Sequence, residues 1–132
     1  MFYASVMRVA LCQLPASSDP AVNLGRVQNA LTSATAAGAE LAVCPEGTQA
    51  SFASDLRAVA EPVDGPFCKG LAEAALGAGI AVVAGVFERA PGGRVYNTTV
   101  AFGADGQLVA AYRKIHLFDA LGYRESELIA PG

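Results

Sequence analysis

Short apolar runs alternate with segments of helical periodicity through residues 6–87. The runs are "VMRVALCQL", "ELAVC" and "IAVVAGVF", and their β-branched and small apolar residues are typical of strands. Strands separated by helices pair in parallel, because the chain must cross back over the sheet to begin each one. The order therefore predicts a βαβαβ unit, in an α/β fold with helices packed on a sheet.

Local signals set the expected limits of the helices. Asp19 precedes a proline, which is an N-cap followed by the residue favoured at the first helical position. Apolar residues then recur at helical spacing as far as Gly38. A short helix is expected to start at residues 54–55, and a second main helix to run from Phe67 to residues 77–79.

After the third apolar run the sequence pattern changes from strand–helix alternation to that of a β-hairpin. "RVYNTTVAF" alternates, "GADG" is a hairpin signal, and "QLVAAYRK" supplies a partner strand that we interpret as buried. We therefore expect an antiparallel hairpin after the βαβαβ unit. Residues 115–132 carry loop and turn chemistry.

Composition limits the domain count and the class of partner. The chain has 132 residues, of which 53% are hydrophobic and 16% charged, so we expect one domain whose apolar surface is partly covered by something else. The net charge is −3 and the basic residues are scattered. We expect no nucleic-acid or membrane partner.

The three cysteines, Cys12, Cys44 and Cys68, lie far apart without metal-ligand spacing. Reduced thiols fit a cytoplasmic protein without a metal. The start of the chain is neither a secretory signal nor a membrane span. The segment "MRVALCQL" predicts a strand that begins at Met7. Residues 1–6 are therefore expected to be an N-terminal extension.

Two charged residues follow expected strands. Glu46 comes after "ELAVCP" and Lys114 after "QLVAAYR", and ligands bind beyond the carboxyl ends of strands in open α/β sheets. Each alone is most simply a solvated charge. On adjacent strand ends, a carboxylate and an ammonium would form a pair able to move protons and stabilise an oxyanion. Strand alternation turns Arg113 to the opposite face, in a structural role, and His116 is expected to support the loop.

The segments "VALCQL", "CPEG", "AGVFER", "VYNTTVAFGADGQLVAAYRKIHLFD" and "RESELIAPG" resemble, in order and spacing, the N-terminal half of the nitrilase superfamily of carbon–nitrogen hydrolases. The resemblance runs from Met7 to Gly132 and is strongest to the amidase branch that includes ω-amidases and deaminated-glutathione amidases. It implies the N-terminal part of a four-layer αββα sandwich. The single domain, residues 1–132, would then be truncated.

The resemblance also implies a mechanism without metal or organic cofactor. The family's Glu–Lys–Cys triad places its glutamate on Glu46 and its lysine on Lys114, and a supporting glutamate on Glu125. Its nucleophilic cysteine lies in a later segment, which this chain does not contain. The complete form is expected to hydrolyse the amide of a small carboxylate-bearing substrate, and the isolated chain to be inactive.

The sequence also allows other interpretations. Cys44 shares strand parity with Glu46 and could act as a substitute nucleophile, and a Cys–His hydrolase using His116 is formally possible. The chain could instead be a non-catalytic binding or assembly module, or the product of an interrupted gene. Its partners would be a small amide substrate in the complete form, and a second copy or another chain that covers the exposed sheet.

Overall fold

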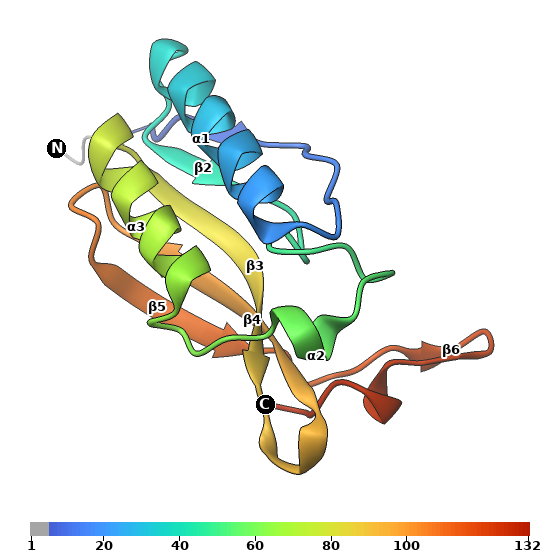
Figure 1. Cartoon of the computed structure of the whole chain (residues 1–132). Helices are drawn as coiled ribbons and strands as arrows, with labels where there is room; N and C mark the ends of the chain where they lie inside the picture. The colour runs from blue at the N-terminus through green and yellow to red at the C-terminus, as the bar shows by residue number, and fades with distance from the viewer. Residues whose placement is uncertain (1–5) are drawn as a thin grey trace, which may run out of the picture.

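A computed structural model describes residues 6–132. One mixed sheet carries the fold, with strands in the order β1 (Val9–Leu11), β2 (Leu41–Val43), β3 (Ala81–Arg89), β4 (Val95–Phe102) and β5 (Leu108–Arg113). The first three strands are parallel and the last two antiparallel to their neighbours. The predicted βαβαβ unit followed by a hairpin is therefore confirmed (Figure 1).

The helices begin and end close to the predicted residues: α1 spans Pro20–Ala36, α2 spans Leu56–Val59 and α3 spans Pro66–Ala78. The Asp19 side chain accepts a hydrogen bond from the backbone N–H of Ala21, which caps α1.

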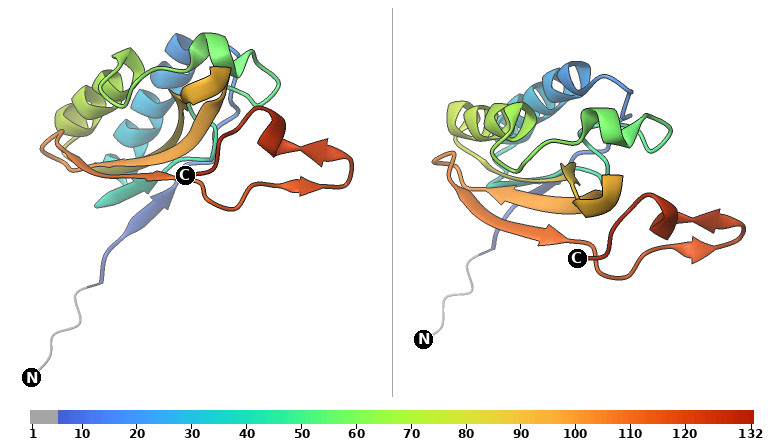
Figure 2. Two further views of the ribbon diagram at one scale, coloured as in Figure 1. Left: turned by 90° about the horizontal axis from the view of Figure 1, so that it is seen from below. Right: turned by 60° about the horizontal axis from the view of Figure 1, so that its bottom comes forward.

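Helices α1 and α3 lie on one face of the sheet (Figure 2). Their apolar residues pack with Ala42, Val82, Ala84 and Val100 to form the main core. A smaller cluster around Phe87 and Ile129 lies beneath the loop that carries α2. Neither α1 nor α3 covers the other face of the sheet, where Leu11 is 82% exposed and Tyr112 is 56% exposed.

Three expectations need correction. Every residue of β5 is exposed, so the strand interpreted as buried is an open edge strand. The uninterrupted apolar run "ELAVC" predicts a strand buried on both faces, but in β2 Leu41 and Val43 are only half-buried, because their face of the sheet has no second layer over it. Residues 115–132 are not entirely irregular, since β6 (Asp119–Ala120) and β7 (Tyr123–Arg124) form a small hairpin before a 3₁₀ turn at Glu125–Glu127.

The expected N-terminal extension, residues 1–6, lies outside the described residues except for the exposed Val6. Within residues 6–132, no helix is both long and apolar enough to cross a membrane.

Candidate active site

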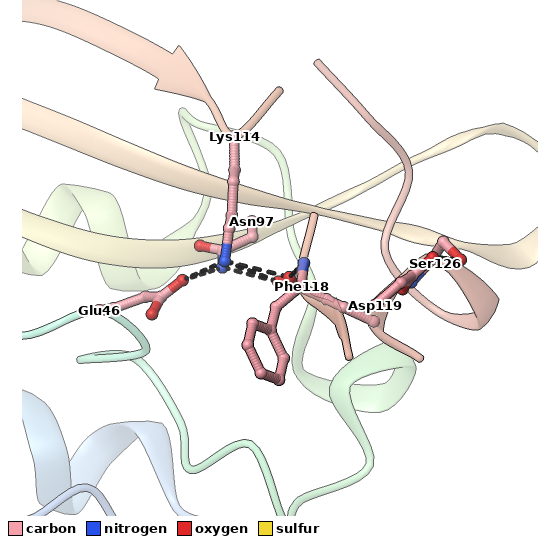
Figure 3. A network of polar contacts seen from close by, with 7 residues as sticks. Glu46, Asn97, Lys114, Phe118, Asp119 and Ser126 are labelled. Carbon is pink, nitrogen blue, oxygen red and sulfur yellow. Dashed lines mark hydrogen bonds and ion pairs between the residues drawn. The ribbon is translucent and has the colours of Figure 1, made fainter. Parts of the chain in front are cut away.

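The side chains of Glu46, Lys114 and Glu125 meet in one polar cluster, and Figure 3 shows Glu46 and Lys114 pointing toward each other. The cluster lies on the face of the sheet away from the main core, because Gly85, which contacts Glu46, alternates along β3 with residues of that core. The Lys114 Nζ lies 3.1 Å from Glu46 Oε1 and 3.0 Å from Glu125 Oε2. The structure thus brings together all three residues selected from the sequence. Two carboxylates share one ammonium, so the cluster carries one net negative charge when all three groups are ionised.

Glu46 reaches this cluster by crossing over β3. The expectation that Glu46 and Lys114 follow adjacent strands is wrong, because β3 and β4 lie between β2 and β5. After β2 the chain stays hydrogen-bonded to β3, with the Gly85 N–H donating to the Pro45 carbonyl at 3.2 Å. A Cβ on Gly85 would lie 2.9 Å from Glu46 Cα and 2.6 Å from Gly47 N. Glycine at this position therefore allows the close crossing.

Lys114 is held by the backbone on both sides. Its N–H donates to the Asn97 carbonyl at 2.8 Å, and its carbonyl accepts from the Gly132 N–H at 2.9 Å. Burial lowers the pKa of Lys114, but hydrogen bonds to Glu125 and Glu46 raise it by more, so its pKa is above the ordinary value. The lysine is therefore held as a cation.

Glu125 is the buried member of the cluster, with a side chain that is 3% exposed. The hairpin β6–β7 returns the chain so that Glu125 Oε2 accepts the Phe118 N–H at 2.6 Å. Asp119 braces the same turn by accepting hydrogen bonds from the Ser126 hydroxyl and N–H. The Ser126 hydrogen bonds hold the pKa of Asp119 below its usual range.

A fourth polar side chain, Asn97, belongs to the cluster and was not selected from the sequence. Its Nδ2 donates to Glu46 Oε1 at 2.6 Å and lies 3.4 Å from Glu125 Oε1. The sequence held one signal for it, because an amide in the middle of the alternating "VYNTTV" run must find a partner when buried.

A cavity of about 490 Å³ opens onto the cluster. Its lining consists of Glu46, Phe52, Ala53, Lys114, Phe118, Tyr123 and Glu125. Its size falls in the range of small-molecule sites, and its mixture of aromatic walls with a few convergent polar groups is typical of them.

Arg113 points away from this cavity, as strand alternation predicted. Its guanidinium forms two 2.9 Å hydrogen bonds with Glu88 and lies 4.2 Å from the centre of the Tyr96 ring. Burial raises the pKa of Glu88, but Arg113 and the Thr98 hydroxyl outweigh it, so that pKa is lowered. The Glu88–Arg113 pair ties β5 to β3.

The alternative nucleophiles are poorly placed. Cys44 lies in the main core beneath the helices, and burial, with a smaller contribution from the neighbouring Cys12, raises the pKa of its thiol to about 12. Burial likewise raises the pKa of Cys68 to about 12. His116 is exposed, and among residues 6–132 no side-chain hydrogen bond ties it to the loop it was expected to support.

Known proteins are similar to this chain in sequence. The family model for carbon-nitrogen hydrolases matches residues 8–132. The hydrolase Rv0480c of Mycobacterium tuberculosis is 48% identical over 128 residues, which cover 96% of this chain and 46% of that protein. The ω-amidase NIT2 of Danio rerio is 37% identical over 134 residues, covering 97% of this chain and 48% of that protein.

Solved structures of amidases have a similar fold. An amidase from Nesterenkonia sp. superposes with a TM-score of 0.84 at 30% identity, covering 99% of this chain and 50% of that one. The chain thus spans about half the length of the relatives it matches, and its sheet and helices correspond to the N-terminal part of the nitrilase-superfamily fold. The chain belongs to the carbon-nitrogen hydrolase family.

Proposed function

We propose that this chain is the proton-transfer half of an amidase, whose complete form hydrolyses the amide of a small carboxylate-bearing substrate to an acid and ammonia. The observation that carries the proposal is the contact of Lys114 with both Glu46 and Glu125 at the mouth of an aromatic-walled cavity. The ω-amidase relatives support the substrate class.

In this mechanism Glu46 is the general base. Its side chain is 54% exposed, so a thiol or a water can approach it. Glu46 removes the proton from a cysteine thiol, and the thiolate attacks the amide carbon. The same carboxyl group returns the proton to the nitrogen, the C–N bond breaks, and ammonia leaves. Glu46 then deprotonates a water that cleaves the thioester, releasing the acid and restoring the thiol.

Lys114 stabilises the negative oxygen of each tetrahedral intermediate. Its charge is needed there at neutral pH, and its raised pKa fits that role. Glu125 contacts no part of the substrate in this scheme. It orients Lys114 through a buried carboxylate that is itself fixed by the Phe118 N–H.

The nucleophile is proposed to come from a segment or chain beyond the described residues. Cys44 and Cys68 are buried with raised pKa values, and thiolate character is what a nucleophile requires. Cys12, Cys44 and Cys68 are all free, which suits a reducing cytoplasm. In a related structure of the Nesterenkonia amidase, acrylamide has added to an active-site cysteine.

A second candidate is a non-catalytic assembly module, and the exposed apolar residues of the open sheet face favour it. This face would be covered by a second copy or by another chain. Loss of catalysis through an interrupted gene would leave the same surface exposed.

Turnover measurements separate these functions. The chain is assayed alone and together with the C-terminal half of the mycobacterial relative, with α-ketoglutaramate-type ω-amides as substrates and ammonia release as the readout. We expect turnover only in the mixture or in a fusion of the two. Glu46→Gln and Lys114→Ala should each abolish turnover, because the loss of one member of a catalytic unit costs about as much activity as the loss of all of them. Continued turnover by either variant would remove the site assignment.

A further inference from the structure

Asn97 occupies a fixed position between the two carboxylates. It lies on β4 opposite Phe87 of β3, and its own carbonyl accepts the Lys114 N–H. Asn97 is 4% exposed. Its backbone is therefore set by the sheet, and its side chain extends to the same cluster as the lysine (Figure 3).

The hydrogen bonds at Glu46 are asymmetric. Its Oε1 accepts from Asn97 Nδ2 at 2.6 Å and from Lys114 Nζ at 3.1 Å. Among residues 6–132, no group donates to its Oε2. Both oxygens of Glu125 are occupied, Oε1 by Lys114 and Oε2 by the Phe118 N–H. Glu46 Oε2 is thus the carboxylate oxygen of the cluster that has no donor among the described residues.

A half-exposed glutamate side chain has several rotatable bonds, and one ionic contact to a flexible lysine fixes it poorly. A second donor on the same oxygen, from a side chain anchored in the sheet, fixes the plane of the carboxylate. An amide does this without adding charge. Its nitrogen must face the two carboxylates, because its oxygen would be repelled by them.

We infer that Asn97 is a positioning residue that holds Glu46 so that Oε2 is the oxygen that accepts and returns the catalytic proton. The inference rests on the proposed function for the identity of the base. It goes beyond that function by assigning separate roles to the two oxygens and a role to an amide outside the triad.

A purely structural role for Asn97 predicts something different. In that case its loss would lower stability and leave the orientation of Glu46 unchanged. The informative variants are Asn97→Leu, which removes the donor at similar size, and Asn97→Asp, which keeps the shape but replaces the donor by an acceptor. Thr99→Val is the matched control, because Thr99 is exposed on the same strand and pairs with Tyr112 of β5.

The first measurement needs no activity. Crystal structures of the whole chain, with ¹³C-carboxyl NMR of Glu46, report the orientation of its carboxylate in each variant. We expect Asn97→Leu and Asn97→Asp to release Glu46 into more than one orientation while the Lys114–Glu125 contact persists. Thr99→Val should match the unmodified chain. An unchanged single orientation of Glu46 in Asn97→Leu would overturn the inference.

The second measurement adds the C-terminal half of the mycobacterial relative. Misplacing a catalytic group by about 1 Å costs on the order of 10²-fold in rate, so kcat should fall by about that factor in both Asn97 variants, with KM unchanged. Full kcat in Asn97→Leu would also overturn the inference. If the unmodified mixture shows no turnover, the proposed function fails, and the orientation measurement still decides where Asn97 directs Glu46.

Discussion

The backbones of Gly85 and Glu46 approach closely on the open face of the sheet. A Cβ on Gly85 would lie 2.9 Å from Glu46 Cα. This contact lets the loop after β2 cross β3 and deliver a carboxylate to a lysine that follows β5. The site therefore depends on the lack of a side chain at Gly85 as well as on its charged groups.

Gly85→Ala should displace Glu46 from Lys114 and destabilise the chain by about 1–3 kcal/mol, since overpacking of this kind forces backbone shifts. Gly25→Ala is the control, because a Cβ on Gly25 within α1 meets nothing within 4 Å and should stabilise by about 0.5–1 kcal/mol. Urea unfolding and a crystal structure of each variant provide the test. An undisturbed Glu46–Lys114 contact in Gly85→Ala would contradict the role given to this glycine.

Glu125→Gln should lower the pKa of Lys114, because the neutral amide no longer favours the ammonium. The pKa of Lys114 in the folded chain is raised above its ordinary value of 10.5. Its contribution to stability is thus fully present below pH 10.5 and is lost as pH rises through the folded-state value. The unmodified chain should accordingly lose more stability above pH 10.5 than Glu125→Gln does. NMR titration of the Lys114 side chain and unfolding at alkaline pH measure both effects.

Arg113→Met should destabilise the chain by about 3 kcal/mol, the lower end for a broken buried ion pair, because Arg113 is half exposed while Glu88 is buried. The pKa of Glu88 is lowered in the folded chain, so its contribution is present above the ordinary value of 4.5 and disappears as pH falls through the folded-state value. The difference in free energy of unfolding between the unmodified chain and Arg113→Met should therefore become smaller in acid. Arg113→Met should leave the Glu46–Lys114 contact intact, since it lies on the opposite face.

The open sheet face should drive self-association of the isolated chain. Leu11→Lys combined with Tyr112→Lys places charge where apolar side chains are 82% and 56% exposed, and should shift the chain toward the monomer. Leu76→Lys, at an exposed position on α3, should have no such effect. Sedimentation velocity over a range of concentrations decides. A monomeric unmodified chain at every concentration would contradict this expectation.

Periodicity and turn chemistry were sufficient to predict the order of strands and helices, because these signals act over a few neighbouring residues. They could not predict that β5 is exposed, because its exposure depends on what covers the sheet. The crossing of Glu46 over β3 could not be predicted either, because it depends on the space left by Gly85 and not on the residues around Glu46. The hairpin β6–β7 has strands of two residues each, too short for a detectable alternation.

The three charged residues were found through their positions after strands and through the family resemblance. Asn97 was missed because alternation indicates which side of a strand a residue faces, but not which groups arrive there from distant loops. Its partners Glu46 and Glu125 are separated from it by 51 and 28 positions.

In the proposed reaction this chain supplies the base and the cation, while the nucleophile comes from outside it. Mass spectrometry of an acyl adduct identifies the cysteine that acts as the nucleophile. The chain is combined with the C-terminal half of the mycobacterial relative, exposed to substrate, quenched in acid and digested. We expect a thioester on a cysteine of the added half and none on Cys12, Cys44 or Cys68. A thioester on Cys44, with turnover by the isolated chain that Cys44→Ala abolishes, would contradict it.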